Sequence, residues 1–155
     1  IERFENVGLK IIGMKMVNVN ENLAQKHYVV ENFVKTTVPK TRAAYAKRGI
    51  SIKESDVEIA QRIQKMLITY LQEGPVIALL LEGHHAIEVT RKLVGETEPR
   101  SAAPGTIRGD FFMDSYMLAD AQERPIRNLI HASGNKEEAE YEIALWFTKE
   151  EIISN

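Results

Sequence analysis

The sequence contains no cysteine, which excludes both a disulfide framework and a thiolate metal site. It also has no apolar run near the roughly 20 residues of a membrane-spanning helix, because the longest run, residues 76–81, has the length of a buried strand. Charge of neither sign dominates: the net charge is -2 and the pI about 6.1, which excludes a generally basic nucleic-acid-binding domain. A cysteine-free chain without a signal-like apolar start fits a reducing compartment. We therefore expect a cytoplasmic protein with no membrane or specific nucleic-acid partner.

The length of 155 residues is ordinary for one compact domain, and a hydrophobic content of 44% is enough for a core. We predict a single domain over residues 1–155. Residues 1–5 resemble the last turns of a helix that ends at Gly8. Since a domain rarely begins midway through a helix, we expect further residues upstream of Ile1.

Hydrophobic spacing predicts the elements of the first part of the chain. Residues 9–19 alternate and are rich in β-branched and long apolar side chains, which predicts a strand. Asn20 is a candidate N-cap for a helix that Pro39 ends or restarts. The apolar face of this helix carries Leu23, His27, Val30 and Val34.

A second helix is predicted after Ser55 or Asp56, either of which can cap it, because apolar residues then recur at three and four. This stripe consists of Ile59, Ile63, Met66, Leu67, Tyr70 and Leu71. The continuous apolar run 76–81 predicts a strand covered on both faces. Another helix is expected over about 85–94.

The second half of the chain begins with a loop over 96–110 and a polar segment over 111–124 that is typical of a surface insertion. Residues 127–131 read as a short strand, and 136–147 as the last helix. The visible order is strand, helices, strand, helix, loop, strand, helix. With a further strand before the opening helix it becomes β-α-β, helices, β-α-β, which favours an α+β fold of the ferredoxin-like type. In that fold helices pack on an antiparallel sheet, here with helical insertions.

A basic stretch runs from residue 35 to residue 53 without an acidic side chain. Its cations are Lys35, Lys40, Arg42, Lys47, Arg48 and Lys53. Such a run is typical of a solvated helical face, and it also fits a contact with phosphates or with a neighbouring subunit.

The four histidines differ in their settings. His84 and His85 are adjacent and project in different directions, so they make a poor chelate and we expect structural or solvent-facing roles. His27 belongs to the apolar helical face and is expected to be packed. His131 ends an apolar run and precedes a turn of small residues, 132–134, a setting that often presents a side chain into a cleft.

The loop 104–110 has the sequence Pro-Gly-Thr-Ile-Arg-Gly-Asp. Its two glycines let the backbone approach an anion, and Arg108 can bind a phosphate bidentately. The P-loop motif G-x-x-x-x-G-K-[ST] does not occur in the sequence. Taken alone, the loop is explained equally well as a phosphate site or as a structural turn.

Three ordered blocks, residues 104–111, 127–133 and 142–147, closely resemble the signature segments of nucleoside diphosphate kinases. Further matches in the same order are Arg3-Phe4-Glu5 through Lys15, Gly74-Pro75-Val76, Leu81-Glu82-Gly83 and Gly95-Glu96-Thr97. The resemblance covers nearly the whole chain except the insertions. Several ordered blocks are much more specific than any single motif.

The resemblance implies a transferase of the kinase class that passes the γ-phosphoryl group of a nucleoside triphosphate to a nucleoside diphosphate by a ping-pong mechanism. By position, His131 is the nucleophile that becomes a phosphohistidine. Glu142 and Ser133 match the residues that orient this histidine. Tyr28 matches a tyrosine that lies close to it.

The nucleotide contacts are implied by the same resemblance. Arg91, Thr97 and Arg108 match groups that hold the phosphates, and Asn128 matches the residue that contacts the sugar. Mg²⁺ is expected on the phosphates of the nucleotide and not in a protein cage, so no protein metal site is predicted. We expect nucleoside di- and triphosphates as binding partners and, from the resemblance alone, a homo-oligomer.

The sequence departs from the family pattern in four ways. The family's first strand, whose Lys-Pro-Asp lysine reaches the phosphates, has no counterpart. Gly134 stands where an aspartate is usual. Ile63 replaces an aromatic that packs on the base, while Leu67 keeps the apolar neighbour. Two insertions span roughly 40–57 and 113–123, the second of them after the phosphate loop.

The resemblance favours an active kinase of broad nucleotide specificity, which apolar contact with the base implies, and two other functions fit parts of the sequence. The alternative is a catalytically impaired nucleotide-binding or assembly module of the same fold. The missing lysine segment and Gly134 favour it, whereas the retained His131, Arg108, Asn128 and Glu142 oppose it. A third function, that of an unrelated ferredoxin-like regulatory domain, requires the ordered blocks to be coincidental.

Overall fold

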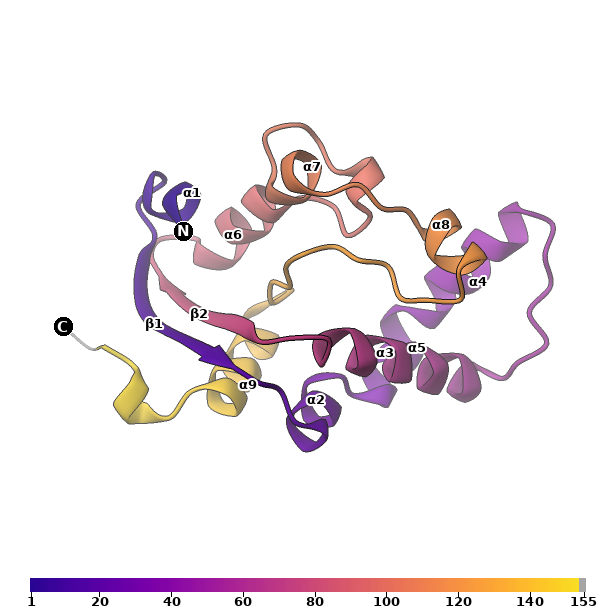
Figure 1. Ribbon diagram of the computed structural model, residues 1–155, viewed down its shortest axis with the longest axis horizontal. Coiled ribbons are helices and arrows are strands. Elements are labelled where there is room, and N and C mark those ends of the chain that lie inside the picture. The colour runs from indigo at the N-terminus through magenta and orange to yellow at the C-terminus, as the bar shows by residue number, and fades with distance from the viewer. Residues whose placement is uncertain (154–155) are drawn as a thin grey trace. The chain divides into compact units, whose positions relative to one another are not determined.

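The computed structural model describes residues 1–153, which form two compact units. One unit combines residues 1–17 with the chain from Val76 onward, and the other is the continuous segment Asn18–Pro75 (Figure 1). Each unit has a buried apolar cluster of its own. Within residues 1–153, none of the helices is long and apolar enough to cross a membrane.

The first unit contains an antiparallel pair of strands, β1 (Lys10–Val17) and β2 (Val76–Glu82), which confirms the two predicted strands. Lys10 lies opposite Glu82 at one end, and Val17 lies opposite Val76 at the other. A register shift between Ile11 and Gly13 marks a bulge.

The two faces of this sheet differ in what covers them. On one face the Phe147 ring lies over Gly13, where an added Cβ atom would be 3.0 Å from the ring and 3.3 Å from Cβ of Leu80. On the other face Met16 and its cross-strand partner Ile77 are exposed, at 71% and 59%. The prediction that 76–81 is covered on both faces is therefore wrong at Ile77.

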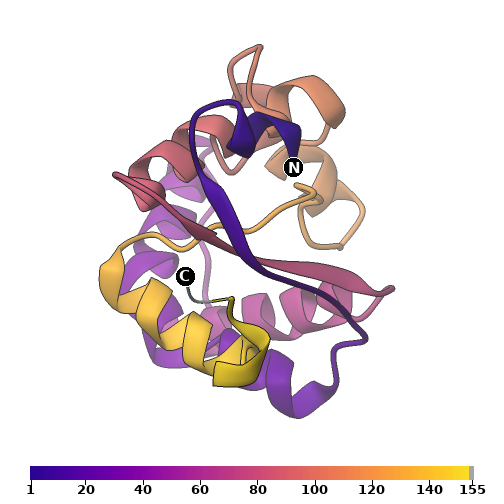
Figure 2. The same ribbon diagram turned by 90° about the vertical axis from the view of Figure 1, so that its left-hand side faces the viewer.

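Five α-helices of the first unit are described: α1 (Glu2–Glu5), α6 (Ala86–Val94), α7 (Ile107–Phe111), α8 (Tyr116–Ala121) and α9 (Lys136–Trp146). Two 3₁₀ turns, η1 (Pro99–Ser101) and η2 (Lys149–Glu151), accompany them. Figure 2 shows α1 and α6 together at one end of the strands and α9 away from them. Phe4, Leu9 and Val94 form the buried cluster where α1, β1 and α6 meet.

The second unit consists of α2 (Glu21–His27), α3 (Val30–Thr36), α4 (Val38–Lys47) and α5 (Asp56–Leu71). Its buried cluster is Val38, Ile59 and Ala60, which are fully inaccessible. Asn20 caps α2, as predicted, by accepting a hydrogen bond from the Leu23 amide. Ser55 is the cap of α5 and forms a capping box with Glu58.

One predicted helix is divided in the structure. The apolar spacing from Leu23 to Val34 predicted a continuous helix, but α2 ends at His27 and α3 begins at Val30. The Tyr28 carbonyl accepts a hydrogen bond of 2.5 Å from the Gln64 side chain of α5. This tertiary contact takes a carbonyl that a continuing helix would have used.

The basic stretch forms α4 and the loop that follows it. Arg42 fixes this loop, because its guanidinium donates to the Ile52 and Glu54 carbonyls and to the Asp56 carboxylate. The remaining cations are exposed: Lys35, Lys40, Lys47, Arg48 and Lys53. The solvated-face interpretation describes these side chains, and a contact with phosphates or a neighbouring subunit stays a prediction.

The predicted strand over 127–131 is wrong, since these residues form an irregular segment. Leu129 has φ +65°, outside the extended region, and the Ile130 amide donates to the Asn128 carbonyl over 2.8 Å. The Asn128 and Ile130 carbonyls both accept hydrogen bonds from Arg108. Because Arg108 takes two carbonyls that a strand would give to its neighbour, the segment turns instead of pairing.

The segment 111–124 contains α8 and has both an exposed and a buried side. Its exposed apolar residues are Phe111, Met113, Tyr116, Met117 and Leu118. Asp114, Ser115 and Ala119 are buried. The segment is therefore anchored in the first unit, and it is more than the surface insertion that its polar centre predicted.

Candidate active site

His131, Ser133 and Glu142 converge in the first unit. Glu142 Oε1 lies 2.7 Å from His131 Nε2, and Glu142 Oε2 accepts a short hydrogen bond from the Ser133 hydroxyl. The Glu142 side chain is 15% exposed, whereas that of His131 is 49% exposed. A carboxylate facing Nε2 assigns the imidazole proton to that nitrogen, so neutral His131 carries its lone pair on Nδ1.

The turn after His131 is fixed by the start of α9. Asn135 caps the helix by accepting from the Glu138 amide over 2.8 Å. The Gly134 amide donates to Glu138 Oε2 over 2.7 Å, and a Cβ atom at Gly134 would lie 2.7 Å from that oxygen. Gly134 stands where the family pattern has an aspartate, and in this chain the carboxylate next to the turn belongs to Glu138.

Arg108 is buried, with 7% of its surface exposed. It lies on α7, which the Thr106 side chain caps. Its guanidinium donates to the carbonyls of Gly95, Asn128 and Ile130 over 2.9, 3.2 and 2.5 Å. Arg108 therefore joins the end of α6 to the turn that precedes His131, and its predicted phosphate contact stays a prediction.

A cleft of about 420 Å³ lies beside this turn. Its lining residues are Arg91, Lys92, Gly95, Glu96, Thr97, Ser101, Ala103 and Thr106. Arg91 donates to the Ala132 carbonyl over 3.4 Å, and Nδ2 of the Asn128 side chain donates to the Thr97 carbonyl over 3.4 Å. Arg91 thus joins the cleft to Ala132, the residue after His131, and Asn128 contacts Thr97 in the lining.

The loop 104–110 is held by charge. Asp110 accepts a hydrogen bond from the Gly105 amide over 2.8 Å and forms an ion pair with Arg3 over 2.5 Å. The Gly105 amide and the Arg3 guanidinium together lower the pKa of the Asp110 carboxyl. Arg3 also donates to the Gly105 carbonyl over 3.0 Å. Asp110 is therefore ionised and ties the loop to α1.

Three predicted site residues belong to the second unit. Tyr28 ends α2 and packs its ring against His27 and Phe33. Ile63 and Leu67 lie on α5 and are half-buried, Ile63 against the cluster around Ile59. Their predicted roles at the base and near the histidine stay predictions.

The remaining histidines are placed much as their sequence settings predicted. His84 and His85 are exposed, and His85 is the left-handed residue before α6. His27 is half-buried and stacks edge-on against Tyr28.

Three residues that hold the site were not singled out from the sequence: Asp114, Arg124 and Glu138. Asp114 is 2% exposed and forms an ion pair of 2.6 Å with Arg124. The Arg124 guanidinium lowers the pKa of this carboxyl to about 2. Asp114 and Arg124 both lie in irregular chain, where no hydrophobic periodicity indicates which residues will pair. The sequence therefore does not predict this ion pair.

Comparison with known proteins identifies the family of this chain. The family model described as nucleoside diphosphate kinase matches residues 57–152. A nucleoside diphosphate kinase of Pyrobaculum aerophilum is 40% identical over 99% of this chain and 87% of its own, and its crystal structure matches with a TM-score of 0.91. The enzyme of Borreliella burgdorferi is 37% identical over 99% of this chain and 79% of its own.

The structure of that Borrelia enzyme, a transition-state mimic with bound vanadate and ADP, matches with a TM-score of 0.82. A Halobacterium salinarum nucleoside diphosphate kinase in complex with CDP matches with a TM-score of 0.68 at 30% identity. These likenesses define a phosphotransferase with the ferredoxin-like fold, which confirms the predicted fold class. The chain belongs to the nucleoside diphosphate kinase family, and it is an enzyme that transfers phosphate between nucleotides.

Proposed function

We propose that this enzyme carries the transferred phosphoryl group on Nδ1 of His131. The observation that supports this is the 2.7 Å contact between Glu142 and His131 Nε2, because it directs the other ring nitrogen to the reaction. In the first half-reaction the Nδ1 lone pair attacks the γ-phosphorus of a nucleoside triphosphate. The bond to the bridging oxygen breaks and the diphosphate leaves with its electron pair.

The second half-reaction reverses the first. The terminal oxygen of a second nucleoside diphosphate attacks the phosphorus, the P–N bond breaks, and its electron pair returns to Nδ1. The proton stays on Nε2 throughout, since the Glu142 carboxylate accepts a hydrogen bond from the Nε2–H group and stabilises the positive ring of the phosphohistidine. Ser133 holds Glu142 in this position.

Arg91, Thr97 and Arg108 are proposed to contact the phosphates, and Asn128 the sugar. Arg91 and Thr97 support this role because they line the cleft beside the His131 turn. Charge on the transferring group is then opposed by groups that are already in place. Mg²⁺ would be held mainly by the nucleotide and would offset the charge of its phosphates, since Glu96 is the one carboxylate among the described residues that line the cleft.

The base is proposed to lie against Ile63 and Leu67, with Tyr28 near the histidine. Apolar contact without base-specific hydrogen bonds would give broad nucleotide specificity. We also propose a homo-oligomer, which light scattering would reveal as a mass above the 17.6 kDa of one chain. A cytoplasmic location is proposed from the nucleotide substrates.

The test is intact-mass spectrometry after brief incubation with Mg·ATP. Wild type should gain about 80 Da in an acid-labile form that added GDP discharges, because the intermediate is a phosphohistidine. His131→Ala should gain nothing, and His84→Ala, an exposed histidine outside the site, should behave as wild type. If folded wild type gains no mass, the phosphohistidine mechanism is wrong and a nucleotide-binding module becomes the better account.

A further inference from the structure

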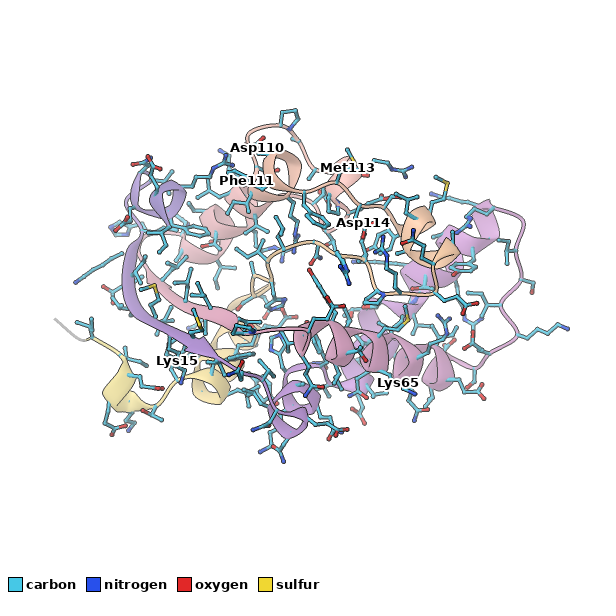
Figure 3. The ribbon with its side chains drawn as sticks, viewed as in Figure 1. Lys15, Lys65, Asp110, Phe111, Met113 and Asp114 are labelled. Carbon is cyan, nitrogen blue, oxygen red and sulfur yellow. The ribbon has the colours of Figure 1, made fainter. Side chains whose placement is uncertain are left out.

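Asp114 is a buried carboxylate that the proposed chemistry does not use. It lies between α7 and α8, just after the exposed side chains of Phe111 and Met113 (Figure 3). One oxygen accepts from Arg124 Nη1 over 2.6 Å and from the Arg127 amide over 2.8 Å. The other accepts from Arg124 Nη2 and the Ser115 amide, both over 2.9 Å. Four donors satisfy the carboxylate, so the chain around it has one favoured position.

The hydrogen bond to the Arg127 amide transmits this position to Asn128, the next residue. On its other side Asn128 is held by its carbonyl, which accepts from Arg108 over 3.2 Å. The Asn128 side chain makes a long contact, 3.4 Å, with the Thr97 carbonyl. The placement of Asn128 therefore depends more on the backbone hydrogen bonds that Asp114 and Arg108 make around it than on the weak hydrogen bond of its own side chain.

Asp114 is also tied to the loop that carries Thr97. Its backbone carbonyl accepts from the Arg100 amide over 3.0 Å, in the 3₁₀ turn that follows Thr97. Two chain segments that supply predicted nucleotide contacts thus meet at one buried acid. The contacts that orient His131, from Glu142 and indirectly from Ser133, do not involve Asp114.

We propose that Asp114, braced by Arg124, is a positioning residue that sets Asn128 for recognition of the nucleotide's sugar. The proposal rests on the proposed function, since it uses the sugar contact assigned to Asn128. Asp114 acts through the Arg127 amide and touches no substrate. Removing its charge loosens the sugar contact and leaves the nucleophile as reactive as before.

The experiment compares wild type, Asp114→Asn and Arg124→Gln in two reactions. In the first, kcat and KM are measured with ATP and with its 2′-deoxy and 3′-deoxy analogues. In the second, His131 is phosphorylated by phosphoramidate, a small donor without a sugar, and followed by intact mass. Glu54→Gln is the matched control, because Glu54 forms a similar two-contact pair with Arg62 on an exposed surface.

We expect Asp114→Asn to raise the KM for ATP by about tenfold, the size of one lost hydrogen bond, and to bring the ratio of kcat/KM for ATP over the deoxy analogues close to one. Arg124→Gln should shift both quantities in the same direction by less, because the Arg127 and Ser115 amides still hold the carboxylate. The phosphoramidate rate and the Glu54→Gln variant should match wild type. Arg124→Gln carries the test if Asp114→Asn fails to fold.

Three outcomes would overturn the inference. Unchanged sugar discrimination in both variants would show that the brace does not position Asn128. An equal fall in the ATP and phosphoramidate rates would show that Asp114 merely supports the whole site. Wild type that does not distinguish the deoxy analogues would remove the sugar contact itself. A wild type that ATP fails to phosphorylate at His131 defeats the proposed function instead, and the mass measurement separates that case.

Discussion

At the scale of single residues, Glu142 faces both His131 and Ser133 with one carboxylate. Glu142→Gln keeps the shape but places an uncharged amide there, so the ring loses both a fixed proton position and a partner for its positive charge. We expect kcat to fall roughly 10- to 100-fold, as for other carboxylate partners of functional histidines. Single-turnover phosphorylation by ATP measures this step directly.

The control for that substitution lies on the same helix. Glu140 has a side chain that is 67% exposed and pairs with Lys136 over 3.6 Å, so Glu140→Gln should leave the rate unchanged. Equal rates in Glu142→Gln and wild type would mean that the carboxylate does not direct the imidazole.

Asp114 gives a second prediction, for stability against acid. Its pKa is lowered from 3.8 to about 2 in the folded chain, chiefly by Arg124. Because the folded pKa lies below the unfolded one, the stabilisation is complete above about pH 4 and is lost as the pH falls through about 2. At about 1.36 kcal/mol per pKa unit it amounts to roughly 2 kcal/mol.

Urea unfolding at a series of pH values tests this linkage. Between about pH 4 and pH 2 the free energy of unfolding of wild type should fall by about 2 kcal/mol more than that of Asp114→Asn. Parallel curves for the two proteins would show that Asp114 has no perturbed ionisation.

The sequence predicted the polar centre of the site much better than its supports. His131, Ser133 and Glu142 belong to ordered blocks that can be matched by position. Asp114 and its partner Arg124 are ten residues apart in irregular chain, and the hydrogen bonds that join them form only after the chain has folded. Polar contacts of this kind leave no periodic pattern in the sequence.

At the scale of elements, Gly95 joins α6 to the site and allows no side chain. It has φ +86° and ψ -178°, a region essentially confined to glycine, and a Cβ atom there would lie 2.5 Å from Thr106 Oγ1. Gly8 has a similar φ of +84° but open space around it. A side chain at Gly8 therefore meets a backbone cost alone, whereas a side chain at Gly95 meets a backbone cost and a clash.

Gly8→Ala should lower the free energy of unfolding by about 1 kcal/mol, the cost of a left-handed residue. Gly95→Ala should lower it by about 3 kcal/mol or more, because the clash displaces the cap of α7 in addition. Thermal or urea unfolding of both variants measures the difference. Equal losses would mean that the Thr106 contact yields easily.

Elements with strong local signals were predicted well, and those decided by tertiary contacts were not. The stripe of α5 and the apolar run of β2 extend over a whole element, so the sequence alone locates them. The break at Tyr28 and the turn at Leu129 each depend on a side chain at least twenty residues away, Gln64 and Arg108. Local pattern gives a continuous helix and a strand there, and the remote hydrogen bond overrides both.

At the scale of the whole molecule, the proposed roles divide between the two units. The residues proposed for phosphoryl transfer and for the phosphates and sugar, among them His131 and Arg91, belong to the first unit. The residues proposed for the base, Ile63 and Leu67, belong to the segment Asn18–Pro75, as does Tyr28, which is proposed to lie near the histidine. That the chain behaves as a single domain stays a prediction.

The register of the two strands gives that division a practical meaning. Val17 and Val76, the residues on either side of Asn18–Pro75, are cross-strand partners, so the segment leaves and re-enters the first unit at neighbouring points. Chain insertions with closely spaced ends are the kind that proteins exchange without refolding their host. We call the segment Asn18–Pro75 a cassette, because its two junctions with the first unit lie next to each other and the segment can be replaced as one piece.

A chimera that carries the Pyrobaculum aerophilum version of the cassette should therefore still be phosphorylated at His131. Its relative rates with GDP, CDP and UDP as acceptors should follow the donor of the cassette, and a preference that stayed with the recipient would place base recognition elsewhere. Selectivity for the base could then evolve by exchange of one contiguous stretch of gene, while His131 and the residues that orient it, Ser133 and Glu142, are inherited unchanged.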